Sequence, residues 1–474
     1  MNRRNFLAHS ATLTAASVLL NRTSVAALMV VPQDRPEPSQ RKFTSVAVEN
    51  TIKEVSASIK NPELRRLFEN CFPNTLDTTV FYREEDGAED TFIITGDIDA
   101  MWLRDSTAQV WPYLPLVRQD ENLKKMIRGL VRRQTACVLL DPYANSFYRD
   151  ATRSSAWASD QPSPKAGVHE RKWEVDSLCY VIRLAHGYWK ASKDTSPFDQ
   201  QWKKAMQTIV ETFRTEQRRK GDSPYRFKRT TSAMEDAPVH DGTGRPARFT
   251  GMIYSMFRPS DDATLFPFLI PSNLFAVKSL RQLAEMANAV VRDPDFANEC
   301  LSLASEVENG IQKFGIAQHP VFGKIYAYEA DGFGNVVFMD DANVPSLLSL
   351  AYLGINRTDD EIYQRTRDFV LSHENPWYIK GQAGEGNGSP HTGKESIWPM
   401  SIIMRALTSR RDEEILFCLQ QLIDTHAGTY FMHESFHKDD PYRFSRSWFA
   451  WANTLFGELV LKIYQDKPYL LKSI

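Results

Sequence analysis

The stretch WEVDSLCYVIRLAHGYW, residues 173–189, has the pattern of a helix that packs one face against a core. Its apolar residues Val175, Leu178 and Ile182 are spaced by three and four positions, which places them on one helix face. The same spacing returns in SNLFAVKSLRQLAEM, residues 272–286. We therefore predict that the fold is built from amphipathic helices.

Helical patterns of this kind recur along the chain, and the links between them come in two lengths. The patterns cover residues 105–117, 120–138, 173–192, 197–219, 272–291, 293–314, 342–353, 359–372, 394–408, 411–426 and 447–465. Links of a few residues join the two members of each pair, whereas the links between pairs are long. The long links are residues 72–104, 139–172, 220–271, 315–341, 373–393 and 427–446.

This alternation of link lengths restricts how the helices can be arranged. Antiparallel neighbours joined in this way place all short links at one end of the assembly and all long links at the other. Six long links, with N-terminal helices available to close the ring, predict an all-α (α/α)6 barrel with long loops on one face. Loops of such length in a compact domain are usually functional. An open superhelix of the same helix pairs is the alternative.

Local signals add detail to this architecture. In TTVFYREEDGAEDTFIIT, residues 78–95, the central Asp86-Gly87 separates two β-rich runs, which predicts a small β-hairpin near the N-terminus. Ser272 follows a proline and is expected to cap the helix that begins there. Gly354 follows an apolar run at a position where a left-handed helix end is expected.

The composition excludes several classes of partner. The chain has 474 residues, 42% of them hydrophobic, and no Ser/Gly- or Pro-rich linker, so we expect one domain over residues 45–474. A net charge of −2 gives no attraction to nucleic acid or to a membrane surface, which favours a neutral small molecule as partner.

The cysteines lack zinc-binding spacing and are expected to be buried free thiols, with one disulfide as an alternative. They are Cys71, Cys137, Cys179, Cys300 and Cys418.

The N-terminus has the features of an export signal. Residues 1–26 contain Arg3-Arg4, a weakly apolar stretch and a small-residue end, which predicts a signal peptide. The paired arginines resemble a twin-arginine signal, and an ordinary secretory signal is the alternative. Residues 27–44 are expected to form a flexible segment. No lipidated cysteine follows, so we expect a soluble protein that is exported to the periplasm or secreted.

Every long link contains or ends in a cluster of polar side chains. The clusters are formed by Asp97, Asp99, Trp102, Arg104 and Asp105; by Asp141, Asn145, Glu174 and Asp176; by Arg258, Asp261 and Asp262; by Asp340, Asp341 and Asn343; by His391, Glu395 and Trp398; and by His433, Glu434 and His437. In the predicted ring all of these clusters converge on one crater.

Helix capping explains part of this pattern, because Asp105, Asp341 and Glu395 stand where helices are expected to begin. Capping does not explain acids interleaved with large apolar residues, as in FRPSDDATLFPF (257–268) and YFMHESF (430–436). A carboxyl group beside apolar side chains is desolvated and its pKa rises, which suits a general acid.

The motifs of other chemistries are missing from the sequence. It has no GxSxG elbow for a serine nucleophile and no Gly-rich phosphate loop with lysine. The adjacent acids Asp261-Asp262 and Asp340-Asp341 lack the ligand series of a calcium loop, so they are weak evidence for a metal. Paired carboxylates in an aromatic-rich pocket remain, and they suit glycoside hydrolysis.

Several long motifs in one order resemble glycoside hydrolase family 125, the exo-α-1,6-mannosidases. The motifs are GDIDAMWLRDS (96–106), DPYANSF (141–147), FRPSDDA (257–263), PHTGKESIWPMS (390–401), HESFHKDDP (433–441) and WFAWANTLFGEL (448–459). The resemblance runs from about residue 45 to the C-terminus. It implies an (α/α)6 barrel and an inverting hydrolase that removes terminal α-1,6-linked mannose from an oligosaccharide without a metal or other cofactor.

The resemblance also implies the two catalytic residues. The general base is Glu434, and the general acid is an aspartate of the FRPSDD motif, for which we choose Asp261 over Asp262. Adjacent side chains on extended backbone point opposite ways, so only one of the two can face the sugar. An inverting enzyme needs about 6.5–9.5 Å between its two carboxyl groups to leave room for a water. Asp261 is expected to be kept protonated by apolar neighbours.

The remaining polar and aromatic residues are expected to hold the terminal mannose. The candidate substrate-binding residues are Asp99, Trp102, Arg104, Asp105, Asp262, Tyr254, Arg258, His391, Trp398 and His433. Three rival functions are left open: a polysaccharide lyase, a non-catalytic glycan-binding protein and a calcium-dependent mannosidase.

Overall fold

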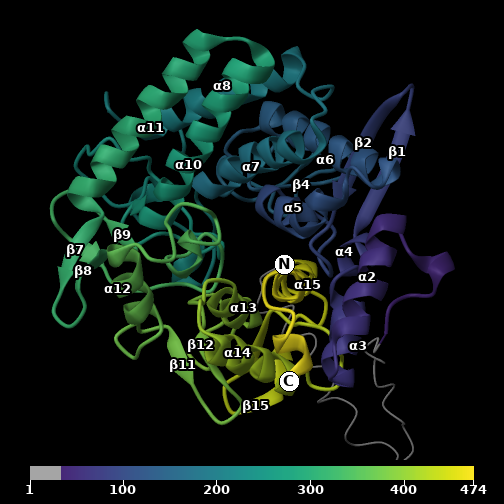
Figure 1. Ribbon diagram of the computed structural model, residues 1–474. Helices are drawn as coiled ribbons and strands as arrows, with labels where there is room; N and C mark the ends of the chain where they lie inside the picture. The colour runs from purple at the N-terminus through teal and green to yellow at the C-terminus, as the bar shows by residue number, and fades with distance from the viewer. Residues whose placement is uncertain (1–33, 222) are drawn as a thin grey trace, which may run out of the picture.

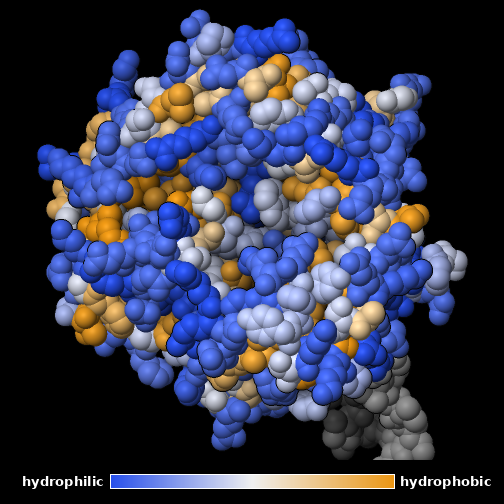
Figure 2. Space-filling model, in the orientation of Figure 1, coloured by the Kyte–Doolittle hydropathy of each residue, from blue (hydrophilic) through white to orange (hydrophobic). Residues whose placement is uncertain are grey.

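The computed structural model describes residues 34–221 and 223–474, which form two concentric rings of helices around one axis (Figure 1). The inner ring contains α5 (Leu103–Val110), α7 (Val175–Ser192), α10 (Ile270–Met286), α13 (Pro399–Leu407) and α15 (Ala450–Asp466). The outer ring contains α2 (Val46–Ser58), α3 (Pro62–Cys71), α6 (Glu121–Leu140), α8 (Gln200–Glu216), α11 (Pro294–Phe314), α12 (Glu361–Val370) and α14 (Asp412–Asp424). The predicted (α/α)6 barrel is confirmed. Seen along the axis in space-filling form, the molecule is hollowed at its centre (Figure 2).

The first and last helices close the ring. The α15 helix lies between α13 and α5 and also packs on α3. Its entry is tied to the N-terminal part of the chain, because Ala450 donates a backbone hydrogen bond to Thr95 (3.0 Å) and Asp97 donates one to Trp448 (3.3 Å). Inside the contact, the hydroxyls of Thr75 and Thr454 lie 2.7 Å apart. Residues nearly 400 positions apart in sequence therefore share one core.

Two inner-ring segments are shorter than the sequence predicts. The pattern over 105–117 becomes α5 followed by the 3-10 helix η2 (Trp111–Leu116), because Pro112 and Pro115 remove backbone donors. The predicted helix over 342–353 is wrong, since only the 3-10 turn η5 (Leu348–Leu350) forms there. Asp340 accepts the backbone amides of Leu347 (2.8 Å) and Leu348 (3.0 Å), which are then not available to a longer helix.

Of the local predictions, the cap at Ser272 is wrong, whereas those for Gly354 and the hairpin are confirmed. Ser272 does not cap, because α10 already begins at Ile270 and the Ser272 hydroxyl lies 3.3 Å from Asp176 Oδ1. Gly354 is left-handed as expected, with φ of 69°. The predicted hairpin is confirmed as β1 (Val80–Glu85) and β2 (Ala88–Ile93), and both residues of its Asp86-Gly87 turn have positive φ.

Small sheets join the long loops to one another. Strands β3 (Met101–Trp102), β4 (Ser146–Phe147) and β5 (Val168–Glu170) form one sheet. Strands β13 (Ser396–Ile397), β14 (Ser435–His437) and β15 (Asp440–Ser445) form another, and β6 (Phe268–Leu269), β9 (Glu329–Ala330) and β10 (Val336–Val337) form a third. Two-stranded sheets are formed by β7 (Ile316–His319) with β8 (Gly323–Tyr326) and by β11 (Tyr378–Lys380) with β12 (Glu385–Asn387). Each sheet holds loop backbone in a fixed register, which gives the loop side chains defined positions.

The cysteines are buried, and the described part of the N-terminal segment contacts the domain. All five cysteines are buried free thiols, as expected. The predicted signal peptide and residues 27–33 lie outside the described residues. From Asp34 to Thr44 the chain is bound to the domain, because Arg35 forms ion pairs with Glu49 and Asp77. Among the described residues, no helix has the length and apolar character needed to cross a membrane.

Candidate active site

The candidate site lies at the N-terminal ends of the inner helices. Arg104 stands in the first turn of α5 and Glu174 immediately precedes α7. Asp261 belongs to the loop before α10, and Glu434 belongs to the loop before α15. Since the inner helices run parallel to one another, their long entry loops meet at the same end of the barrel (Figure 1).

Arg104 is buried at the centre of a group of carboxyl groups. Its Nη1 donates to Glu174 Oε2 at 2.5 Å and lies 3.3 Å from Asp176 Oδ2. Its Nη2 lies 3.7 Å from Asp261 Oδ1, and its Nε lies 3.6 Å from Asp105 Oδ2. One guanidinium therefore faces four acids. Buried charges of one sign cannot all persist, so part of this group must retain protons.

Burial raises the pKa of three carboxyls in this group. Burial raises the pKa of Glu174 well above its ordinary value, against the opposing charge of Arg104, and the charge of Asp261 raises it further. Burial also raises the pKa of Asp176 against Arg104. For Asp105, burial raises the pKa to about 6, with Arg104 lowering it and Asp261 raising it.

Asp261 differs from the sequence expectation. Burial and the charge of Glu170 raise its pKa, but Lys172, Arg104 and a hydrogen bond from Glu174 lower it more, so it lies below its ordinary value. The expectation of a carboxyl kept protonated by apolar neighbours is therefore not met. Arg104 and Lys172 lie close to it, and the carboxyl whose pKa burial raises is the adjacent Glu174.

Two residues, Asn145 and Lys172, fix the position of Asp261. Asn145 Nδ2 donates to Asp261 Oδ1 (3.1 Å) and lies 3.3 Å from Glu174 Oε1, so one amide orients both carboxyls. Lys172 Nζ donates to the carbonyl oxygen of Asp261 (2.7 Å) and to Asp236 Oδ1 (2.9 Å). Asp261 has φ of 66°, a strained region for a non-glycine residue, and the Lys172 contact stabilises it.

Replacing Lys172 by methionine is expected to lower the free energy of unfolding by up to about 3 kcal/mol, because buried Asp236 would lose one of its cations and be left with Arg229. Chemical denaturation of the purified variant measures this loss. The matched control is Arg357→Met, whose side chain is 85% exposed and pairs only with Asp359, and it should leave stability unchanged. Equal stability of the two variants would contradict the role assigned to Lys172.

The other catalytic candidate, Glu434, is held by two side chains. Ser445 Oγ donates to its Oε2 at 2.9 Å, and Arg446 Nη1 lies 3.3 Å from its Oε1. Arg446 also pairs with Asp97. The charge of Arg446 lowers the pKa of Asp105, just as that of Arg104 does. Asp105 is thus influenced by both arginines, of which Arg104 contacts Asp261 and Arg446 contacts Glu434.

The predicted alternative acid, Asp262, faces different partners. Its Oδ2 accepts from Ser260 Oγ (3.1 Å), and its Oδ1 lies 3.4 Å from His391 Nδ1. Adjacent Asp261 faces Arg104 and Asn145 instead. The two aspartates therefore point to different sides, as predicted.

The aromatic and exposed candidates lie around this cluster. Trp102 is buried, with its ring edge-on to His169 at 5.1 Å. The Trp398 indole donates to Thr392 Oγ1 (2.8 Å) and its ring is 6.4 Å from that of His391. Asp99 is exposed and pairs with Arg153 at 2.8 Å.

Three candidates make contacts that fix loop structure. The Tyr254 hydroxyl donates to the carbonyl of Ala247 (3.3 Å). Arg258 Nε donates to buried Glu329 (2.7 Å). His433 stacks on Phe444 at 3.7 Å, and burial lowers its pKa to about 4, so its imidazole is neutral. Substrate binding by these three residues stays a prediction that their contacts do not support.

Sequence reasoning missed two residues that organise the site, Lys172 and Arg446. Lys172 lies in ERKWEVDS (170–177), and Arg446 lies in a segment that follows the HESF motif. The signal was present in both places as a basic residue inside an acid-rich loop. Among residues 34–221 and 223–474, no group of three or more His, Cys, Asp or Glu side chains is placed to hold a metal ion.

Comparisons with known proteins agree with this geometry. The family model described as metal-independent α-mannosidase (GH125) matches residues 61–461. The Meiotically up-regulated gene 157 protein of Schizosaccharomyces pombe is 41% identical over 461 residues, which cover 94% of this chain and 90% of that protein.

Solved structures show the same relationship. A Streptococcus pneumoniae metal-independent α-mannosidase, in a non-productive complex with α-1,6-mannobiose, superimposes with a TM-score of 0.86 at 44% identity. The match covers 90% of this chain and all of that one. A bacterial glucoamylase complexed with acarbose shares the fold alone, with a TM-score of 0.50 at 13% identity over 79% of this chain and 51% of that chain. The chain is therefore a glycoside hydrolase and belongs to family GH125, the metal-independent α-mannosidases.

Proposed function

We propose that this protein is an inverting exo-α-1,6-mannosidase that removes terminal mannose from the non-reducing end of oligosaccharides or N-glycans. The observation that carries the proposal is that the site contains two carboxyl groups, those of Asp261 and Glu434, with different neighbouring residues. Asp261 lies beside Arg104 and Glu174, and burial raises the pKa of Glu174, whereas Glu434 is bound by Ser445 and Arg446. The α-1,6-mannobiose complex of the pneumococcal relative supports the choice of linkage.

The proposed reaction uses these two carboxyls on opposite sides of one sugar carbon. The proton shared by Glu174 and Asp261 passes from Asp261 to the glycosidic oxygen as the bond from that oxygen to the anomeric carbon breaks. A water attacks the anomeric carbon from the other side and gives its proton to Glu434. Solvent then returns a proton to the acid pair and removes one from Glu434.

Arg104 and Arg446 set the charge of the two halves of the site. Arg104 contacts Glu174 and Asp261, which keeps the acid pair from holding two protons. Arg446 Nη1 lies 3.3 Å from Glu434 Oε1, which orients the carboxyl that is proposed to act as the base. An acid and a base with unlike surroundings can thus coexist at one pH.

The configuration of the first product tests the proposal. Proton NMR of an α-1,6-mannobiose digest, followed from the first minutes, is expected to show β-mannose before it equilibrates with the α anomer. The α-1,2 and α-1,3 disaccharides serve as linkage controls and should be cleaved more slowly. If α-mannose appears first, the inverting mechanism is wrong, and an unsaturated sugar product would indicate a lyase.

The pH profile tests the role of Glu174. Its raised pKa means that the acid pair keeps a proton until the pH rises through that value, and kcat/KM should fall above it. In Glu174→Gln the amide has no acidic proton to supply. Asp261 must then hold the catalytic proton itself, although Lys172 and Arg104 lower its pKa. The alkaline limb is therefore expected to move to lower pH, and an unmoved limb would contradict proton sharing.

Export is a separate proposal that rests on residues 1–26 alone. Fractionation of cells that express the whole chain tests it, with Arg3→Lys and Arg4→Lys combined as the control for twin-arginine transport. Activity confined to the cytoplasm for the unaltered chain would overturn it.

A further inference from the structure

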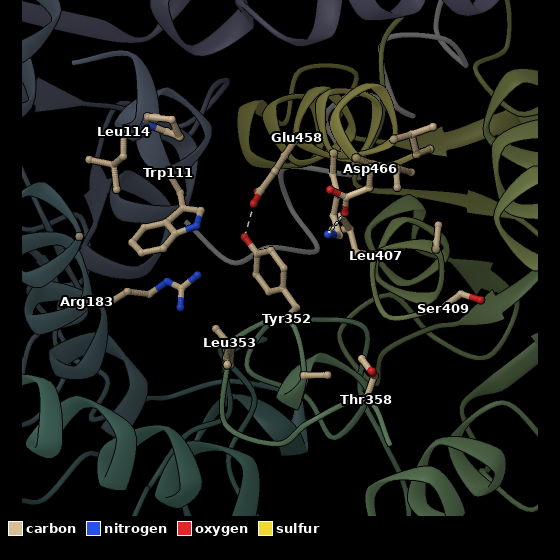
Figure 3. A pocket seen from close by; sticks show the side chains of 18 of the residues that line it. Trp111, Leu114, Arg183, Tyr352, Leu353, Thr358, Leu407, Ser409, Glu458 and Asp466 are labelled. Atoms are coloured by element: carbon tan, nitrogen blue, oxygen red, sulfur yellow. Dashed lines mark hydrogen bonds and ion pairs between the residues drawn. The ribbon is translucent and has the colours of Figure 1, made fainter. Parts of the chain in front are cut away.

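A cavity whose lining includes none of the residues of the carboxyl cluster is shown in Figure 3. It has a volume of about 1050 Å³ and is lined by the C-terminal halves of the inner helices and by the short links. Arg183 and Lys190 of α7, Gln282 of α10, Leu407 of α13 and Glu458 of α15 are among its walls. The carboxyl cluster lies at the N-terminal ends of these helices, so the two regions are separated along the helix axis.

The hollow has a structural cause. Prolines end α5 early, and the segment before Gly354 forms only a short 3-10 turn. Two of the inner-ring positions therefore lack a full helix at this end. Trp111 and Leu114 from the first position, and Tyr352 and Leu353 from the second, line the space that remains.

Arg183 is the buried cation of this cavity, and its charge lowers the pKa of Glu458 in the same lining. Its side chain is buried, with 5% exposed, and extends from α7 into the cavity in Figure 3. Its guanidinium lies 3.7 Å from the Trp111 ring centroid and 5.5 Å from that of Tyr352. Within the described parts of the chain, no acceptor lies at hydrogen-bond distance from it.

This absence sets Arg183 apart from other buried arginines. Arg104, Arg229 and Arg258 each pair with a buried acid. The Arg183 guanidinium borders the cavity instead. An acidic group that enters the cavity can therefore reach it.

The other charged residues of the lining favour an anion. Lys278 and Arg410 also line the cavity, and in the described structure neither forms an ion pair. The acids of the lining are Asp466, which pairs with Lys462, and Glu458. Glu458 accepts a hydrogen bond from Tyr352 (2.9 Å), and burial raises its pKa to about 7, so part of its population is neutral near that pH.

We propose that this cavity binds a small organic anion, with the acidic group against Arg183 and an apolar body against the leucines of the lining. Leu114, Leu353, Leu407 and Leu459 supply that apolar surface. The volume suits a ligand of drug-like size. Binding here is independent of mannoside hydrolysis, which uses the other end of the barrel.

Fluorine NMR with para-trifluoromethylbenzoate as probe tests this site on the full-length protein. Line broadening should give a dissociation constant for the acid, whereas the neutral amide of the same shape should bind at least about tenfold more weakly, because it lacks the charge-assisted bond to Arg183. Arg183→Met is expected to weaken binding of the acid by a similar factor. Equal binding of acid and amide would overturn the proposal, as would no binding at all.

Matched variants locate the probe. Lys190→Met removes a lining cation that already pairs with Glu285 and should change the affinity little. Glu458→Gln removes a negative charge and should tighten binding above neutral pH. Glu434→Gln abolishes turnover but should leave the probe affinity unchanged, and α-1,6-mannobiose should not displace the probe. Displacement by the disaccharide would place the probe in the active site and overturn the proposal.

If Arg183→Met does not fold, a second variant tests the same anion site. The double variant Lys278→Met with Arg410→Met removes two unpaired cations at less buried positions. It should weaken binding of the acid and leave the amide unaffected. Unchanged binding of the acid in this variant would contradict an anion site.

Discussion

Glu434→Gln is expected to lower kcat on α-1,6-mannobiose by at least about 10³-fold, because the amide cannot accept the proton of the attacking water. The amide oxygen can still accept the hydrogen bond from Arg446, and the amide NH2 group can donate to Ser445 Oγ, so the loop and the affinity for the disaccharide should be retained. Mannose release measures the first effect, and calorimetry of disaccharide binding measures the second.

Glu395→Gln is the matched control for this change. Glu395 lies in the neighbouring loop, its side chain is 65% exposed, and its carboxylate is 3.5 Å from His437. Its replacement should leave kcat unchanged. If Glu434→Gln keeps a tenth of the wild-type activity, the base is another residue, and if the unaltered protein binds mannobiose without cleaving it, the protein is a binding protein.

Asp261→Asn is expected to lower the rate on α-1,6-mannobiose by about 10²–10⁴-fold but to affect dinitrophenyl α-mannoside far less. A sugar leaving group needs a proton, whereas dinitrophenolate leaves without one. Comparing kcat/KM for the two substrates therefore isolates the acid step from substrate binding.

Asp262→Asn distinguishes the two adjacent aspartates. Asp262 contacts His391 and Ser260, so its replacement should raise KM for both substrates to a similar degree. If Asp262→Asn, and not Asp261→Asn, shows the dependence on the leaving group, then Asp262 is the acid.

The ring of helices could be predicted because helix periodicity and link length are local properties of the sequence. The segment 342–353 has the same periodicity, yet Asp340 and Pro345 direct its backbone into turns. Side chains that compete for backbone amides act through their orientation, which the apolar pattern does not encode. The prediction failed where a local polar contact outweighed hydrophobic spacing.

The sequence predicted which residues form the candidate site, but it did not predict the pKa shifts of their carboxyl groups. The motifs named the loops that meet, because an acid beside aromatic residues is unusual anywhere in a chain. They could not show that Lys172 and Arg104 surround Asp261, since residues about 90 and 160 positions apart meet only in the folded ring. Apolar neighbours along the sequence therefore gave the wrong sign for the pKa of Asp261.

Closure of the ring by α15 affects how the protein is made. During synthesis the N-terminal helices emerge long before their final partners, and contacts between distant parts of a chain form slowly. Thr75 and Thr95 have their partners Thr454 and Ala450 only after α15 has been synthesised, so the core of a shorter nascent chain is incomplete. Glu434 is translated shortly before α15, so the candidate base and the helix that closes the ring become available together.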